Sequence, residues 1–447
     1  MIRIPRAVTF KWLVGFMNDF KSSMVNVGYL PGILVASIYL ARTIEIGISL
    51  KADDSWMYEF YTLYEVGKVS FLEYLFATHN GSPYVLLRSL YMVEAIFGFS
   101  VMLIIQNIFL LIFTIWLLKL IFQFLVVIGT TTTIALLLCT ILGLSHTFFQ
   151  LLGSILGYLN VLLSLALFFR LLLSFVDLKY YLSKKQTVLV YSILACTGSA
   201  SVTLVVALLV AKLLLTFKLS DLAASKNLRK RKPYFSTGIL SFAFIYLSII
   251  PFSANADSSL IAQANLGNYP QVARMGESNL TTINQNFQAI IHGGRPYSPY
   301  AAEYGNGGID LFLNSITVNL LNWLIPTHIY DDNQNTFGWV NQNTLVFFFC
   351  FILVIFLYCK DSLGLRLLSM LLVVILVSQV PLFLLRGDSF AWYHMRYQLL
   401  LPFLSIVVIA RTIVVVSKPN VTRIITSLTL TFLLFLTFQT LISSPRF

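Results

Sequence analysis

Two adjacent carboxylates, Asp53 and Asp54, directly follow the first long apolar segment of the chain. Adjacent carboxylates repel each other, so one of them is expected to have a raised pKa and to accept a proton as a general base. Acidic residues that are simply solvated at the end of a membrane span would look the same. The aromatic residues Trp56 and Tyr58 follow, and they suit either a substrate-binding surface or an aromatic belt at a membrane interface.

Cationic residues that can bind an anion occur in two places. Arg88 lies in the same early polar region, and its guanidinium is suited to binding a phosphate near the level of lipid headgroups. Arg386, His394 and Arg396 form a second cationic group late in the chain. This group needs a negative partner, which is either a carboxylate such as Asp388 or the phosphate of a ligand. The four cationic residues are therefore candidates for phosphate binding.

The sequence contains no set of residues with the spacing of a metal site, and no cofactor is required by its pattern. A divalent cation bound by Asp53 or Asp54 is an additional option. The four cysteines lie far apart, inside or at the end of apolar segments, and we expect them to be buried free thiols. They are Cys139, Cys196, Cys350 and Cys359.

The composition indicates which elements must position these residues. The chain has 447 residues, of which 58% are hydrophobic and 11% are charged, and its mean hydropathy is +0.83. A soluble domain carries roughly 25% charged residues, so this composition excludes a soluble enzyme and a disordered protein. Apolar segments of about 20 residues recur from end to end, which predicts an all-α polytopic membrane protein.

Ten charge-poor stretches are long enough to be membrane spans. They cover 26–48, 99–118, 124–146, 150–173, 187–217, 236–254, 341–359, 363–385, 399–416 and 424–443. The stretch 187–217 is too long for one crossing, and Gly198 begins a Gly-Ser break in its middle. We therefore predict two short helices there, and about eleven spans in total.

The distribution of charge predicts the orientation of these spans. The basic run 226–232 is expected to be cytosolic under the positive-inside rule. On this topology the cytosolic segments and the adjoining span ends hold 21 of the 30 Lys and Arg residues and 4 of the 18 Asp and Glu residues. The other side holds the remaining 9 and 14, so the two net charges, +17 and −5, add to the total of +12. The basic residues thus indicate contact with anionic lipids of the bilayer and not with nucleic acid.

The same topology divides the chain into segments. We predict a cytosolic lead-in over 1–25, an N-terminal transmembrane module over 26–254, an extracytosolic loop over 255–340 and a C-terminal transmembrane module over 341–447. The N-terminus is then cytosolic and the C-terminus extracytosolic. The first module includes a long extracytosolic loop over 49–98, and in the second loop the stretch 309–325 has the apolar spacing of a helix lying at the outer interface.

Several of these elements together resemble the GT-C superfamily of integral-membrane glycosyltransferases. The resemblance rests on Asp53-Asp54 after the first span, the pair His79-Asn80 followed by Arg88, the broken hairpin at 198–201, and Arg396-Tyr397 followed by Pro402. It covers the topology of most of the chain, while each motif is short. Bacterial members often carry a pattern similar to His-Asn-Glu-His-Arg, whereas this chain continues from Asn80 with Gly-Ser-Pro.

The resemblance implies a function and roles for the residues. It implies a bacterial inner-membrane enzyme that transfers a sugar from a polyprenyl-phosphate donor to a glycan or glycolipid acceptor, with inversion at the sugar and of the kind that modifies O-antigen or other envelope glycans. Asp53 or Asp54 would act as the base or coordinate a metal ion. Outward-facing cations would hold the donor phosphate, and the remaining residues would bind substrate: His79, Asn80, Trp56, Tyr58 and Tyr397.

Three other functions remain open at this point, and one of them is a non-catalytic assembly or scaffold subunit. A flippase or transporter of a lipid-linked glycan would show polar residues along a path through the spans, but the spans are mostly apolar, and no internal repeat is convincing. An O-antigen-ligase-like enzyme with a pyrophosphate-linked donor would need a dense arginine cluster in a late outer loop. The loop 255–340 has only Arg274 and Arg295.

Overall fold

The computed structural model describes residues 27–46, 75, 78–79, 82–83, 85–145, 148, 158–198, 200–215, 234–248, 313, 316–317, 320–321, 323–324, 342–380, 400–417 and 420–443. This part of the chain is helical apart from one antiparallel pair of two-residue strands, β1 (Thr78–His79) and β2 (Ser82–Pro83). The predicted all-α class is confirmed for the described residues.

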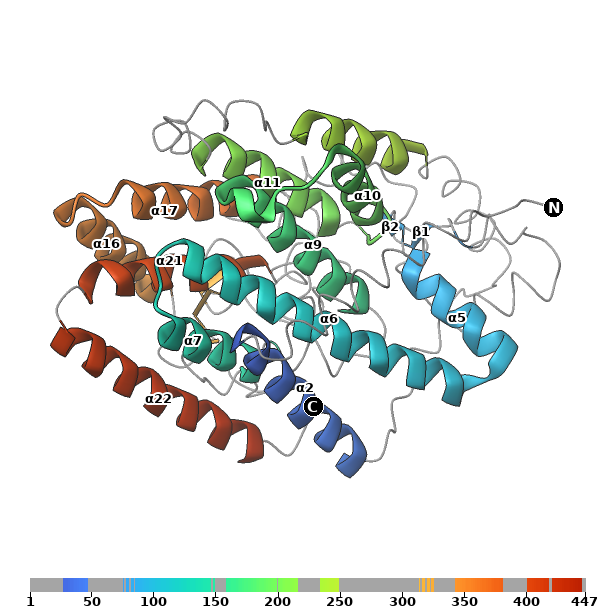
Figure 1. The fold of residues 1–447 in the computed structure, drawn as a ribbon, viewed down its shortest axis with the longest axis horizontal. Helices are drawn as coiled ribbons and strands as arrows, with labels where there is room; N and C mark the ends of the chain where they lie inside the picture. The colour runs from blue at the N-terminus through green and yellow to red at the C-terminus, as the bar shows by residue number, and fades with distance from the viewer. Residues whose placement is uncertain are drawn as a thin grey trace, which may run out of the picture.

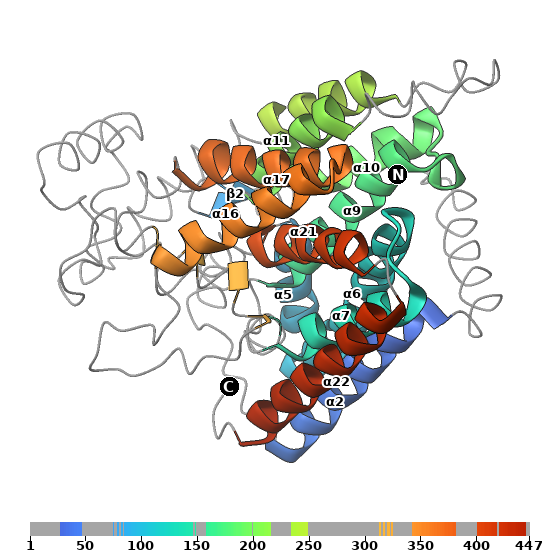
Figure 2. The same cartoon turned by 90° about the vertical axis from the view of Figure 1, so that its left-hand side faces the viewer.

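Helices far apart in the sequence pack into one bundle (Figure 1). The first half contributes η1 (Val27–Tyr29), α2 (Leu30–Ile46), α5 (Val85–Phe97), α6 (Phe99–Val127), α7 (Thr132–Leu144), α9 (Tyr158–Val176), η2 (Leu178–Tyr180), α10 (Lys184–Ala195), α11 (Ala200–Leu215) and a helix over 235–248. The second half contributes α16 (Gln342–Tyr358), α17 (Ser362–Val374), the π-helical turn η5 (Ile375–Gln379), α21 (Leu400–Val416) and α22 (Asn420–Ser443). Helices α6 and α9 pack against each other at the centre. Helices α2, α7 and α22 cover one side of this pair, and α10, α11 and α17 cover the other (Figures 1 and 2).

The described helices mark the chain as a membrane protein. Three are long and apolar enough, by length and composition, to cross a membrane: Ser100–Val127, Leu159–Val176 and Ser362–Gln379. Shorter apolar helices are Val27–Ala41, Thr132–Leu144, Ser201–Leu215, Phe235–Ser248, Thr344–Tyr358, Leu400–Val416 and Thr426–Phe435. The total of about eleven spans therefore stays a prediction.

The exposed faces of the outer helices are apolar, as a lipid environment requires. On α16 and α22 large hydrophobic side chains recur at helical spacing and are exposed. They include Phe347, Phe351 and Val354 on α16, and Leu428, Phe432 and Phe435 on α22. In water such stripes would be an aggregation hazard, so lipid is the solvent that they suit.

The prediction that the cysteines are buried is only partly right. All four are free, but only Cys139 is buried, whereas Cys350 is exposed on α16 and the other two are half-buried. A thiol is a small apolar group, so an apolar run in a membrane helix does not decide whether it faces protein or lipid.

One predicted span boundary is wrong. We expected spans over 99–118 and 124–146, separated at Lys119, but α6 runs unbroken through Lys119 to Val127. The Lys119 ammonium donates to the Tyr29 hydroxyl and lies 4.0 Å from the centre of its ring. A long side chain that reaches a polar partner lets the helix continue, so this charge does not mark the end of a span.

The predicted break inside 187–217 is confirmed. Helix α10 ends at Ala195, α11 begins at Ala200, and Gly198 between them has a φ of 110°. This left-handed conformation costs little only for glycine, which explains why the break falls there.

Two predicted loop segments are more ordered than expected. The region 49–98 contains α5, a 13-residue helix that packs on α6. The stretch 309–325, expected to lie on the interface, is helical at most of its described positions and enters the protein core. Trp323 is 1% exposed, and its Nε1 donates to Ser405 Oγ of α21 at 2.6 Å. Amphipathic spacing alone cannot distinguish a helix on lipid from a helix on protein.

Candidate functional site

A buried ion pair joins three helix ends. Arg411 near the end of α21 donates from Nε and Nη2 to the two carboxylate oxygens of Asp361, each at 2.7 Å. Its Nη1 donates to the carbonyl oxygen of Ile128 at 2.8 Å. Gly129 follows with a φ of 99°, and a Cβ there would lie 3.3 Å from Arg411 Nη1. The turns after α6 and before α17 are thus tied to α21, and we name this end of the bundle the Arg411 end.

Further contacts bring other helix ends to the Arg411 end. Arg366, on the first turns of α17, donates to the Leu214 carbonyl at the end of α11 at 3.5 Å. Lys212 of α11 lies 3.9 Å from the ring centre of Phe235, which also packs on Phe175 at the end of α9. The charge pattern assigns all these helix ends to the cytosolic side. Their grouping is as predicted, while the side of the membrane that they face stays a prediction.

Buried polar side chains are concentrated in the opposite halves of the central helices. Helix α6 has 29 residues and is about 43 Å long. Gln106 in its first half and Thr114 at its centre are buried, whereas Leu117, Ile121 and Phe124 fill the same face toward the Arg411 end. We name the end of the bundle formed by the first half of α6 and its neighbours the Arg88 end.

Helix α9 shows the same asymmetry. It runs in the direction of α6, because Phe169 packs edge-on to Phe124 and Phe175 lies at the Arg411 end. Its first turns bury Asn160 and Ser164, both 0% exposed, and the buried residues that follow on this helix are apolar. The polar ends of α6 and α9 therefore coincide.

Arg88 is placed at this polar end by α5. The helix precedes α6 across the single residue Gly98 and packs against both α6 and α9 (Figure 1). The Arg88 side chain is 0% exposed. A buried guanidinium is costly unless oxygen atoms surround it, so this position indicates a polar interior at this end of the bundle.

The broken helix adds hydroxyl groups to the same end. Ser164 Oγ of α9 donates to Thr197 Oγ1 at 2.7 Å, beside the Gly198 break, and Ser201 at the start of α11 is also buried. Helix α11 also contacts the π-helical turn η5, in which Ser378 and Gln379 are buried. A π-turn inside a helix is often found at a functional site.

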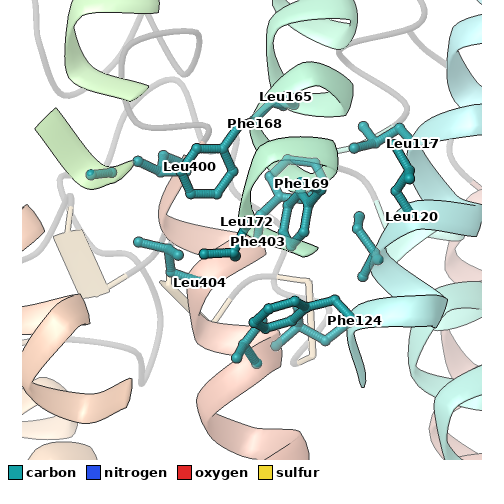
Figure 3. Close-up of a cluster of buried hydrophobic side chains, with 14 of the residues drawn as sticks. Leu117, Leu120, Phe124, Leu165, Phe168, Phe169, Leu172, Leu400, Phe403 and Leu404 are labelled. Carbon is teal, nitrogen blue, oxygen red and sulfur yellow. The ribbon is translucent and has the colours of Figure 1, made fainter. Parts of the chain in front are cut away.

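An apolar layer lies between the buried polar residues of α6 and α9 and the Arg411 end, and Figure 3 shows side chains that belong to it. Aromatic rings from three helices meet in this layer: Phe124 of α6, Phe169 of α9 and Phe403 of α21. The ring centre of Phe169 lies 6.0 Å from that of Phe124 and 6.3 Å from that of Phe403. All three rings are at most 1% exposed. In this conformation the layer separates the buried polar residues of α6 and α9 from the Arg411 end.

Most of the predicted site residues lie outside the described part of the chain. These are Asp53, Asp54, Trp56, Tyr58, Asn80, Arg386, His394, Arg396 and Tyr397. His79 is described only as part of strand β1, paired with Ser82. Arg88 is the predicted site residue whose side chain is described, and its binding role stays a prediction.

Sequence reasoning missed the polar residues within the helices. Gln106, Thr114, Asn160 and Gln379 are single polar residues in apolar runs, and we treated those runs as uniform spans. Asn160 carried a usable signal, since Ser164 follows it at the i+4 position and forms a polar stripe on one helix face. Among the described residues no group of three or more His, Cys, Asp or Glu side chains could hold a metal ion. Asp53 and Asp54, the residues predicted to bind a divalent cation as an option, lie outside the described residues.

Comparisons with protein-family models, with curated proteins and with solved structures give no match for this chain. Its function is therefore argued from its own residues.

The orientation of the bundle can be tested by cysteine labelling. In a variant without native cysteines, Ser100→Cys at the Arg88 end should react with a membrane-impermeant maleimide added outside intact spheroplasts. Lys184→Cys, at the predicted cytosolic start of α10, should react only after permeabilisation. Both residues are exposed in the structure, so burial does not limit the reaction. The reverse pattern would invert the topology and place the polar end in the cytosol.

Proposed function

We propose that the chain is an integral-membrane glycosyltransferase that transfers a sugar from a polyprenyl-phosphate donor to a glycan or glycolipid acceptor at the extracytosolic face. The proposal includes a GT-C-like arrangement of about eleven spans, with the N-terminus cytosolic, the C-terminus extracytosolic and two large extracytosolic loops. It also includes a bacterial inner membrane as the location, which follows from the family resemblance alone.

One observation carries the proposal: fully buried Arg88 lies at the polar end of an otherwise apolar bundle. The charge pattern predicts that this is the extracytosolic end, where Lys and Arg residues are usually less frequent than on the cytosolic side. A cation at this position would attract an anionic ligand that reaches the site from the bilayer. A lipid-linked phosphate meets that description.

The chemistry assigns different tasks to the two kinds of charged residue. An acceptor hydroxyl that attacks the anomeric carbon must lose its proton, and we assign Asp53 as the base that takes it, with Asp54 beside it. The leaving lipid phosphate needs no proton, but cations stabilise the charge that develops on it. Arg88, Arg386 and Arg396 are the residues that we assign to this role, with His394 beside them.

The apolar layer of Phe124, Phe169 and Phe403 favours the enzyme over the flippase. A flippase must pass a polar headgroup through the bundle, whereas the polar residues buried on α6 and α9 all lie on one side of this layer. An enzyme that works at one face needs no such path. A lipid phosphate bound across this layer would instead favour the flippase.

Replacing Arg88 tests the phosphate-binding role. We expect Arg88→Ala to weaken binding of undecaprenyl phosphate about 10- to 100-fold, because hydrogen bonds to charged groups contribute about 1.5–3 kcal/mol. Arg88→Lys should restore binding only in part, since an ammonium lacks the planar fork of the guanidinium. Binding is measured by titration of the purified protein, with Arg366→Lys at the other end as a matched control. Unchanged affinity in a folded Arg88→Ala variant would make Arg88 a structural residue.

A further inference from the structure

Asn160 is a buried amide with an unusual environment. The side chain is 0% exposed, and neither its Oδ1 nor its Nδ2 has a hydrogen-bond partner in the described part of the chain. Burying an amide without partners costs free energy, and a leucine, which has the same branched shape, would avoid this cost. A ligand that supplies the missing hydrogen bonds would account for the amide at this position.

The neighbours of Asn160 are hydroxyl groups. Ser164, one turn further along α9, donates from Oγ to the backbone carbonyl oxygen of Asn160 at 2.6 Å, and the same Oγ lies within hydrogen-bond distance, 2.7 Å, of Thr197 Oγ1. Ser201 follows Thr197 across the Gly198 break and is 0% exposed. We name Asn160, Ser164, Thr197 and Ser201 the amide–hydroxyl layer.

The chemistry of the layer distinguishes between ligands. None of its four side chains carries a charge, so the layer is poorly suited to binding a phosphate. The Asn160 amide can both donate and accept hydrogen bonds, as the hydroxyl groups of a sugar also do, and the three hydroxyl groups, which donate to backbone carbonyls, can accept them. The guanidinium of Arg88 lies on α5, which packs against α9, so a charged site and an uncharged site belong to the same end of the bundle.

From this arrangement we infer that the amide–hydroxyl layer binds the sugar of the lipid-linked donor, with Asn160 as the residue that recognises its hydroxyl groups. The inference rests on the proposed function, because it takes the donor to be a polyprenyl-phosphate sugar. It goes beyond that function by separating the recognition of the sugar at α9 and the broken helix from the recognition of the phosphate at Arg88. Asn160 is a positioning and specificity residue in this scheme, and no chemical step is assigned to it.

The test compares ligands with and without a sugar. The melting temperature of the purified full-length protein is measured with undecaprenyl phosphate and with undecaprenyl phosphates that carry glucose, galactose, mannose, N-acetylglucosamine or arabinose. A ligand that binds the folded state raises this temperature in proportion to its affinity and concentration. We expect at least one sugar-bearing lipid to stabilise the wild-type protein more than the bare lipid phosphate does.

The variant Asn160→Leu should lose this sugar-dependent gain and keep the gain from the bare lipid phosphate. Without ligand it should melt at the wild-type temperature or above it, because an unpartnered amide has been removed. Asn160→Ser, which keeps a small polar group, should also lose most of the gain. The matched control is Thr130→Val at the Arg411 end, where a buried hydroxyl likewise has no partner in the described part of the chain. This control should keep both gains.

The possible failures are distinguishable. If both Asn160 variants keep the sugar-dependent gain, or if the bare lipid phosphate stabilises the wild-type protein as much as every sugar-bearing lipid does, the inference is wrong and the phosphate site stands. If ligand-free Asn160→Leu and Asn160→Ser both melt far below the wild type, Asn160 is structural and the inference is again wrong. If no lipid stabilises the wild-type protein, the proposed donor class fails, and the inference fails with it.

Discussion

Arg411→Leu should destabilise the protein by about 3–5 kcal/mol, because it leaves the Asp361 carboxylate as an unpaired charge in a buried position. The side chains of Arg411 and Asp361 are 18% and 9% exposed, so water compensates little for the lost partner. The same change removes the donor to the Ile128 carbonyl. Since Arg411 joins the ends of α6, α17 and α21, the loss should lower the melting temperature of the whole bundle.

A double variant separates the ion pair from the other contacts. Asp361 also caps α17 by accepting from the Gly364 N–H at 3.1 Å, and serine can take over such a cap. Arg411→Leu with Asp361→Ser removes both charges, so it should be more stable than the sum of the two single changes predicts. Arg366→Leu is the control, since its contact with the Leu214 carbonyl is long, at 3.5 Å. Single variants that melt at the wild-type temperature would show that the pair is solvated and contributes little.

Asp53→Asn should abolish glycosyl transfer. The substitution keeps the size of the side chain and removes the group that accepts the proton of the acceptor hydroxyl. General-base catalysis contributes about 10²–10⁴-fold to the rate, so the loss should be clear in an assay of sugar transfer from a radiolabelled lipid-linked donor. Binding of undecaprenyl phosphate should remain, because the proposed phosphate ligands are unchanged.

The neighbouring carboxylate serves as the matched control. Asp54→Asn should reduce the rate less than Asp53→Asn, since we assign the proton transfer to Asp53 and a supporting role to Asp54. Normal transfer by purified Asp53→Asn would remove this residue from the mechanism. Normal transfer by the variant with both substitutions would contradict the enzymatic role of this region.

The sequence by itself determined the helical class, the membrane character and the break at Gly198. These follow from short-range physics: apolar runs of membrane-spanning length need lipid, and a glycine in the left-handed region ends a helix wherever it lies. The charge pattern also grouped the helix ends that meet around Arg411. Lys and Arg residues near the ends of spans are more frequent on the cytosolic side, so the side that each span end faces can be predicted without a structure.

Tertiary structure alone decided where the charged and polar residues within the helices go. Lys119 was predicted to end a span, but Tyr29, 90 residues away, accepts its hydrogen bond and α6 continues. The pairing of Asp361 with Arg411 and the burial of Arg88 and Asn160 also depend on helices distant in sequence. Whether a polar side chain is paired, buried or lipid-facing depends on the neighbours that packing brings to it, and hydropathy along the chain does not contain that information.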